Sequence, residues 1–211
     1  MFGTAHLDHP WIPGKCSPDG EFLEAYFSRE LVKDLVPIMQ SYGFIALVDY
    51  PGLAPDGVNI KAFTNADDQQ RAELNFRVKK VNEAVKQYGK DNIIYVSLHV
   101  NASGNGQWMS GRGWEVFTSP GKTKSDLLAT CMWNAASNYL TETKMRSDWS
   151  DGDPDKEANY MVLTKTKCPA VLVENLFMDN KEDLALLSSA AGMHKLERII
   201  VEGILNYWLK V

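Results

Sequence analysis

The fold is decided by the stretch Ile93-Ile94-Tyr95-Val96-Ser97-Leu98, which is β-branched and nearly all apolar. A run of this kind is typical of a strand that is covered on both faces, as in a sheet between two layers of helices. His99 follows it directly. In open α/β sheets, ligand sites form in the crevice beyond the carboxyl ends of the strands. The stretch therefore predicts a buried central strand that brings a histidine to such a crevice.

The rest of the chain alternates short apolar runs with amphipathic helical patterns. Further strands are predicted at residues 2–5, 44–48, 114–117, 161–163 and 170–173. Helices are predicted from Leu23 to Met39, from Leu74 to Tyr88 and from Leu127 to Leu140, and two more close the chain. Ser125 is the candidate cap of the third helix. The alternation predicts an α/β fold: one domain over residues 1–211, a sandwich with a mixed, mostly parallel central sheet flanked by helices.

The composition excludes several classes of partner. The net charge of −5 gives no electrostatic reason to expect nucleic acid or an anionic membrane. No apolar run approaches the roughly 18 residues that a membrane span requires, so we expect no membrane insertion. Cys16, Cys131 and Cys168 are odd in number, widely spaced and form no Cys-x-x-Cys pair. We therefore expect buried free thiols and neither a disulfide framework nor a thiolate metal site.

Two of the four histidines follow predicted strands, which makes them candidate metal ligands. His6 comes after the first strand and His99 after the central one, so both could reach the same crevice. A catalytic zinc site needs three protein ligands and an open position for water. Glu24, at the start of the first helix, is the candidate third ligand. Glu174 ends an apolar strand, where a carboxylate needs a metal, a hydrogen bond or a function, and it is the candidate proton acceptor. These spacings permit a zinc site without requiring one.

Four segments carry a more specific signal. Residues 97–101 resemble the Ser-x-His-x-Asn motif of the zinc-dependent N-acetylmuramoyl-L-alanine amidases (amidase type 3). Residues 168–180 resemble that family's Pro-Ala-x-Leu-x-Glu segment with its trailing Phe-x-x-Asn. Residues 74–82 are similar to its Leu-x-x-Arg-Val…Asn helix, and residues 113–116 to its Gly-aromatic-Glu strand. The motifs follow the family's order over nearly the whole chain, and the loop at 13–20 is most similar to versions from gut Bacteroidetes and their phages.

The resemblance implies one zinc ion per chain, with His6, Glu24 and His99 as ligands and Glu174 as the catalytic carboxylate. The family usually has His-Gly-Gly after its first strand, whereas this chain has Leu7 and Asp8 after His6, followed by His9. His9 is therefore a rival first ligand. We prefer His6 because it follows the strand directly, and the departure leaves open a distorted or weakened metal site.

The activity implied by the resemblance is hydrolysis of the amide bond between the N-acetylmuramoyl lactyl group and L-alanine in peptidoglycan. Zinc would lower the pKa of its water from about 15.7 to about 7, and Glu174 would take up the proton and return it to the L-alanine nitrogen. Asn101, Trp108 and Arg77 are the candidate substrate-binding residues. Asn101 could instead hydrogen-bond near His99, and an internal ion pair is the alternative for Arg77.

Two other functions fit the same residues. One is a zinc peptidase or amidohydrolase that acts on another amide bond, and the other is a cell-wall-binding module that has lost catalysis. Met1 to Ala5 run straight into His6 without a basic and apolar leader, so we expect no signal peptide in this chain. The expected setting is the periplasm or cell wall, reached by export or by phage-mediated release as a lysin. The expected partner is peptidoglycan, and we expect a monomer.

Overall fold

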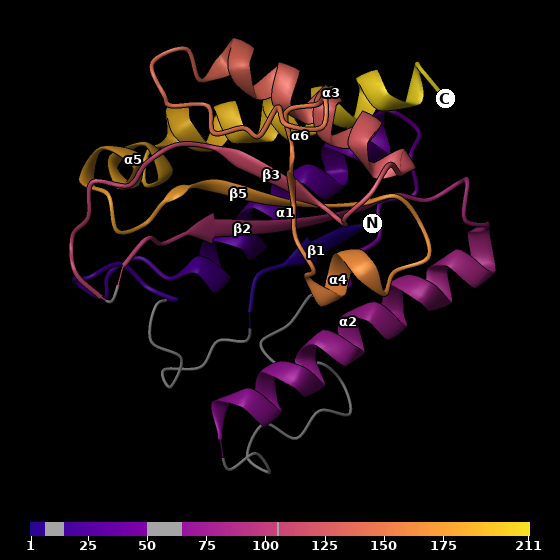
Figure 1. Ribbon diagram of the computed structural model, residues 1–211, viewed down its shortest axis with the longest axis horizontal. Helices are drawn as coiled ribbons and strands as arrows, with labels where there is room; N and C mark the ends of the chain where they lie inside the picture. Colours follow the sequence, from indigo (N-terminus) through magenta and orange to yellow (C-terminus); the bar gives the residue numbers. More distant parts are fainter. Residues whose placement is uncertain (7–14, 50–64, 105) are drawn as a thin grey trace.

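A five-stranded sheet forms the centre of the molecule (Figure 1). The computed structural model describes residues 1–6, 15–49, 65–104 and 106–211. The strands are β1 (Phe2–Thr4), β2 (Tyr95–Asn101), β3 (Glu115–Thr118), β4 (Lys156–Glu157) and β5 (Ala170–Phe177). Their order in the sheet is β1-β2-β5-β3-β4, and only the β3–β5 pair is antiparallel. The predicted mixed, mostly parallel sheet is confirmed.

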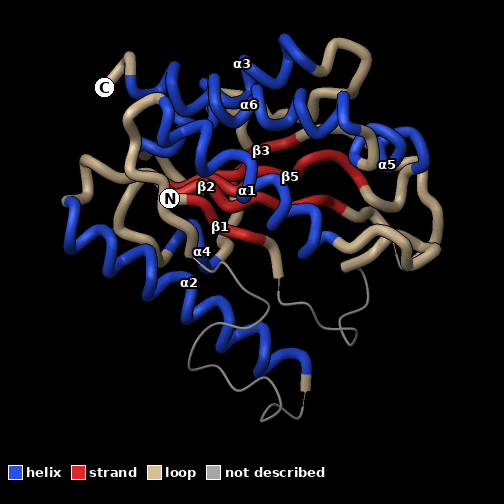
Figure 2. Tube along the Cα trace, turned by 180° about the vertical axis from the view of Figure 1, so that it is seen from behind, coloured by secondary structure: helices blue, strands red, loops and turns tan. Residues whose placement is uncertain are grey.

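One face of the sheet carries most of the apolar core. Three helices cover it, α1 (Glu24–Ser41), α3 (Lys124–Tyr139) and α6 (Ala190–Trp208), with the short α5 (Lys181–Leu187) at one end. Leu31, Leu128 and Leu196, one from each long helix, are fully buried in one cluster that includes Val171 and Val173 of β5. In Figure 2, which views the molecule from behind, α1 lies in front of the sheet and α3 and α6 lie above it. This packing follows from the helical spacing of apolar residues in each helix.

The opposite face is covered more thinly. It carries α2 (Ala66–Tyr88) and the short helix α4 (Met161–Thr164), which lie together in both views (Figures 1 and 2). Their apolar residues form a second, smaller cluster with Tyr95, Leu172 and Phe117 of the sheet. Because side chains alternate along a strand, this cluster shares its face with His99, Glu174 and Glu115. The site described below therefore lies on the side of α2 and α4.

Two predicted strands are wrong. Residues 161–163 form helix α4, in which the Thr164 amide donates to the Tyr160 carbonyl at 2.9 Å. Periodicity cannot distinguish strand from helix in so short an apolar run. Residues 44–48 run extended beside β1 and bond to it through the Phe2 amide and the Leu47 carbonyl at 2.8 Å. They make only an isolated bridge with β1, between Phe2 and Val48.

Two boundaries also differ from the prediction. The cap of α3 is Thr123, whose hydroxyl accepts from the Ser125 amide while Asp126 bonds back to the Thr123 amide. Ser125 instead accepts a hydrogen bond from the Ala170 amide at 3.0 Å, which ties α3 to the start of β5. Strands β2 and β5 continue to Asn101 and Phe177, so the polar residues that the prediction placed just beyond or at the strand ends lie within the strands.

Two helices extend beyond their predicted bounds. Helix α1 runs through Pro37 to Ser41, and α2 begins at Ala66 instead of Leu74 and ends at Gly89, which has a positive φ of 86°. All three cysteines are free, although only Cys131 is buried and the other two are half-buried. No described helix is both long enough and apolar enough to cross a membrane.

Candidate metal centre

His6 lies where the chain turns out of β1. Its backbone has a positive φ of 22°, an uncommon conformation for a residue other than glycine. Helix α1 holds this turn from one side, because the Ala5 amide donates to the Ser28 hydroxyl at 2.7 Å and the Arg29 guanidinium donates to the His6 carbonyl at 3.3 Å. The helix that carries Glu24 therefore also fixes the position of His6.

Glu24 and His99 meet at the start of α1. Glu24 is only 2% exposed, and its Oε1 accepts from the Val100 amide at 3.1 Å. The same oxygen lies 2.9 Å from His99 Nδ1, and Oε2 lies 3.5 Å from His6 Nε2. The other ring nitrogen of His99 lies 3.1 Å from the Ser97 hydroxyl. One buried carboxylate thus faces two imidazoles, and Ser97 sets the orientation of one of them.

These three residues fit a metal ion. One ligand atom from each of His6, Glu24 and His99 lies within 4.8 Å of the others. Two imidazole nitrogens and one carboxylate form a donor set that catalytic zinc sites use. A buried carboxylate shared between two imidazoles also has a charge that a divalent cation would offset. His9 lies outside the described residues, as do residues 13 and 14 of the 13–20 loop.

The pKa values of His6 and Glu24 are both shifted in the direction that favours cation binding. Burial is the main cause that lowers the pKa of His6, to about 3, although the Glu24 charge acts in the opposite direction. Burial would raise the pKa of Glu24, but the neighbouring His6 and His99 outweigh it and lower that pKa to about 2. At neutral pH, His6 is therefore a neutral imidazole and Glu24 an anion, the forms in which both side chains bind metals.

Glu174 stands beside His99 on the neighbouring strand. The two residues are in register between β2 and β5, and Glu115 of β3 is in register with Glu174 on its other side. Burial, followed by the charges of Glu24 and Glu115, raises the pKa of Glu174 well above its ordinary value. Within the described part of the chain, its buried Oε2 accepts no hydrogen bond. An unpaired carboxyl group with a raised proton affinity suits proton transfer.

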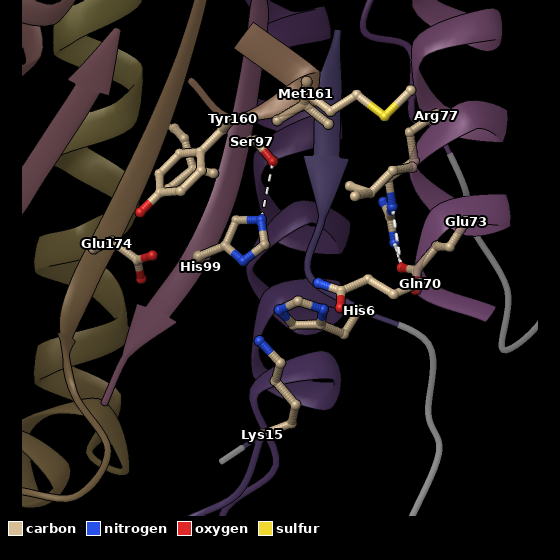
Figure 3. A pocket seen from close by; sticks show the side chains of 13 residues that line it. His6, Lys15, Gln70, Glu73, Arg77, Ser97, His99, Tyr160, Met161 and Glu174 are labelled. Carbon is tan, nitrogen blue, oxygen red and sulfur yellow. Dashed lines mark hydrogen bonds and ion pairs between the residues drawn. The ribbon is translucent and has the colours of Figure 1, made fainter. Parts of the chain in front are cut away.

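A pocket of about 220 Å³ opens over these residues. Figure 3 shows His99 and Glu174 on adjacent strands, with the Tyr160 hydroxyl close to the Glu174 side chain and Lys15 near His6. Tyr160 is fixed by an edge-on contact with the Phe117 ring, 5.5 Å between centroids. Tyr160 and Lys15 could not be predicted from the sequence because neither belongs to a motif. They reach the pocket from the start of α4 and from the loop before α1.

Arg77 lines the pocket but is committed to an internal ion pair. Its side chain is buried, with Nη1 donating to Asp49 at 2.9 Å and Nη2 to Glu73 at 2.7 Å. Nη1 also lies 3.3 Å from the Thr4 hydroxyl, and the Tyr95 hydroxyl donates to the same Asp49 oxygen at 2.8 Å. Of the two readings of Arg77, the internal ion pair is the one that the structure favours, and it steadies the strand that leads into His6.

The other two candidate substrate-binding residues lie away from the pocket. The side-chain amide of Asn101 donates to Glu115 Oε1 at 2.5 Å. The His99 carbonyl accepts instead from the side chain of Asn175 at 3.1 Å. Trp108 is 38% exposed, with the Lys181 ammonium 5.4 Å from its ring centroid. Neither is among the residues that line the pocket. A role for either in substrate binding stays a prediction.

Comparison with known proteins points to one family. The model of the N-acetylmuramoyl-L-alanine amidase family matches residues 11–206, a range that begins after His6. The chain is 28% identical over 139 residues to the endolysin of Bacillus phage SPP1, covering 63% of this chain and 44% of that protein. It is 26% identical over 140 residues to the amidase CwlM of Bacillus licheniformis, covering 66% and 48%. The chain thus spans about half the length of these curated relatives.

Solved structures share the fold. The CwlD amidase of Clostridioides difficile, solved in complex with the GerS lipoprotein, aligns with a TM-score of 0.78 at 19% identity over 100% of this chain and 98% of that one. The amidase AmiC2 of Nostoc punctiforme aligns with a TM-score of 0.70 at 22% identity, over 99% and 95%. At such identities the likeness supports the architecture, and the chemistry must come from the residues themselves.

Proposed function

The chain belongs to the N-acetylmuramoyl-L-alanine amidase family, and we propose that it hydrolyses the amide bond between the N-acetylmuramoyl lactyl group and the L-alanine of the peptidoglycan stem peptide. One observation carries the proposal. His6, Glu24 and His99 converge within 4.8 Å, and Glu174 stands in register beside His99. The proposal treats residues 1–211 as one catalytic domain that acts as a monomer on the cell wall or in the periplasm.

We infer that the metal is zinc and that His6, Glu24 and His99 hold it. Bound there, zinc would acidify a water molecule and polarise the scissile carbonyl group. The chain prepares for this by keeping His6 neutral and Glu24 ionised, and by orienting His99 through the Ser97 hydroxyl. The Val100 amide holds Glu24, and Ser28 and Arg29 of α1 hold the turn at His6, so little reorganisation is needed on binding.

Glu174 carries the proton transfers. Its carboxylate accepts a proton from the attacking water and then donates that proton to the amine nitrogen of L-alanine as the C–N bond breaks. Its raised proton affinity favours the first transfer, and its position beside His99 keeps it next to the reacting carbonyl group. Tyr160 lines the pocket on the Glu174 side (Figure 3).

Digestion of purified peptidoglycan tests the activity. The expected products are free stem peptides that begin with L-alanine, together with intact glycan strands. New amino termini only within the peptides would instead indicate a zinc peptidase. No release at all, from a folded protein loaded with zinc, would favour a wall-binding module.

Metal analysis tests the cofactor separately. We expect one zinc per chain, loss of activity with a chelator and recovery on adding zinc. The Glu24→Ala variant should lose the metal as well as the activity, because Glu24 faces both histidines. A His9→Ala variant that loses zinc while His6→Ala keeps it would move the first ligand from His6 to His9.

A further inference from the structure

A row of ionisable side chains continues past Glu174 onto β3. His99, Glu174 and Glu115 are in register on three adjacent strands, which places their side chains on the same face at intervals of about 4.8 Å. The Glu115 side chain is only 3% exposed. The row therefore leads from the proposed metal ligand, across the proton-transfer group, to a second buried carboxylate.

Glu115 is paired with two cations. Its Oε2 accepts from Arg146 Nε at 2.9 Å and also from the Lys156 ammonium, while Oε1 accepts from the Asn101 amide. The side chains of Arg146 and Lys156 are 28% and 27% exposed. Two partly exposed cations thus share a single buried carboxylate.

Two contacts hold the Arg146 side chain in place. Its guanidinium lies 5.0 Å from the centroid of the Phe177 ring, and Glu115 engages only its Nε. Neither terminal nitrogen donates to any residue in the part of the chain that the structure describes. A guanidinium whose plane is fixed and whose two terminal N–H groups are free is suited to bidentate binding of a carboxylate.

The proposed chemistry sets the direction in which the substrate must lie. The amine nitrogen of L-alanine has to reach Glu174, and the acyl side has to lie over His6 and His99. Glu174 stands between the metal ligands and Glu115 in the row. The stem peptide, which begins at that nitrogen, therefore extends over β3 toward Arg146 and Lys156.

We propose that Arg146, supported by Lys156, is a subsite for a free carboxylate of the stem peptide beyond L-alanine, and that it makes the enzyme distinguish a carboxylate from a carboxamide at that position. This inference rests on the proposed amidase function. The residue next to L-alanine is linked through its side-chain carboxyl group when it is D-isoglutamate, so its α-carboxylate is free to bind. In D-isoglutamine the same group is a neutral amide.

The test compares two substrates that differ only there, N-acetylmuramoyl-L-alanyl-D-isoglutamate and its D-isoglutamine counterpart. The zinc-loaded protein should show a kcat/KM about tenfold or more in favour of the carboxylate, the size of effect expected for a charge-assisted pair. Arg146→Gln should reduce that ratio to about twofold or less, and Arg146→Lys should leave an intermediate ratio. Equal rates for the wild-type protein, or an unchanged ratio in Arg146→Gln, would overturn the subsite.

Arg198 provides the matched control. It also pairs with a glutamate, Glu202, and also lies over an aromatic ring, Tyr139, at 5.8 Å, but on α6. Arg198→Gln should keep the wild-type ratio. If Arg146→Gln fails to fold, Lys156→Gln takes its place and should lower the ratio less strongly.

Binding of the product dipeptides separates the two proposals. L-alanyl-D-isoglutamate and L-alanyl-D-isoglutamine can be titrated into the protein and followed by NMR without any turnover. The subsite requires tighter binding of the carboxylate form, lost in Arg146→Gln. If neither muramoyl dipeptide is hydrolysed, the amidase proposal fails, and this comparison still decides the subsite.

Discussion

The two faces of the sheet are built on different principles. The face covered by α1, α3 and α6 is a large apolar core in which Leu31, Leu128 and Val173 are fully buried. The face toward α2 and α4 has a smaller apolar cluster and buries the charged groups Arg77 and Glu115, beside the half-buried Glu174. Burying charge costs free energy, so the residues that serve the chemistry make the second face less stabilising than the first.

The buried charges on the functional face are themselves of two kinds. Arg77 with its acidic partners and Glu115 with its two cations are paired, and their role is to hold positions. Glu174 lacks such a partner for its buried oxygen among the described residues. The difference indicates which charge is structural and which is chemical, and substitutions of Glu174 and Arg77 test it.

The largest effect is expected at Glu174. Glu174→Ala should lower kcat/KM on peptidoglycan about 10²- to 10⁴-fold, because it removes the group that transfers the proton. Zinc content should stay at one per chain, since Glu174 is not among the three grouped ligands. The melting temperature should stay level or rise, because a buried unpaired carboxyl is lost. Retention of full activity would remove Glu174 from the mechanism.

Arg77 should show the opposite behaviour. Arg77→Met leaves Asp49 and Glu73 buried without their cation and should lower the free energy of unfolding by about 3–5 kcal/mol. Urea unfolding followed by circular dichroism measures it. Lys79→Met on the same helix is the control: its ion pair with Glu83 is exposed, so the cost should be under about 1 kcal/mol. Equal costs for both variants would mean that the buried pairing of Arg77 has no structural importance.

The apolar face should respond in stability alone. Leu128→Ala removes a fully buried side chain and should lower the free energy of unfolding by about 2–5 kcal/mol. At temperatures well below the melting transition, kcat/KM and zinc content should match the wild-type values. A loss of catalysis in the folded variant would show that packing on the apolar face affects the site on the opposite face.

The smallest effect concerns a carboxyl group on the apolar side of the sheet edge. Asp155 bonds to Thr118, and burial, strengthened by Asp153, raises the pKa of Asp155 to about 7 from 3.8. The folded state then holds a proton that the unfolded state has lost, so this group's contribution to stability falls as pH rises from about 4 to 7.

Asp155→Asn removes that dependence. The melting temperature of the variant relative to wild type should rise by a few degrees between pH 5 and pH 8. Thermal unfolding in matched buffers measures the difference. A constant or falling difference over that range would contradict a raised pKa at Asp155.

Much of the fold follows from local sequence. The apolar run at 93–98 predicts a buried strand, and the helical spacing of the apolar residues around Leu31, Leu128 and Leu196 predicts helices that cover the sheet. Both follow because the period of the apolar residues records which face is buried. The motifs around His99 and Glu174 likewise point to the family. The predictions were wrong where periodicity does not decide the structure. The run at 161–163 is too short to distinguish helix from strand, and residues 44–48 make only an isolated bridge to β1.

The sequence by itself therefore determined the layers, the family and the identity of Glu24, His99 and Glu174 as candidate site residues. Only the tertiary structure decided that Arg77 pairs with Asp49 and that Arg146 and Lys156 meet on Glu115. These partners are separated by 28, 31 and 41 residues. A local pattern records which side chains are buried, but which charges meet depends on how distant segments pack.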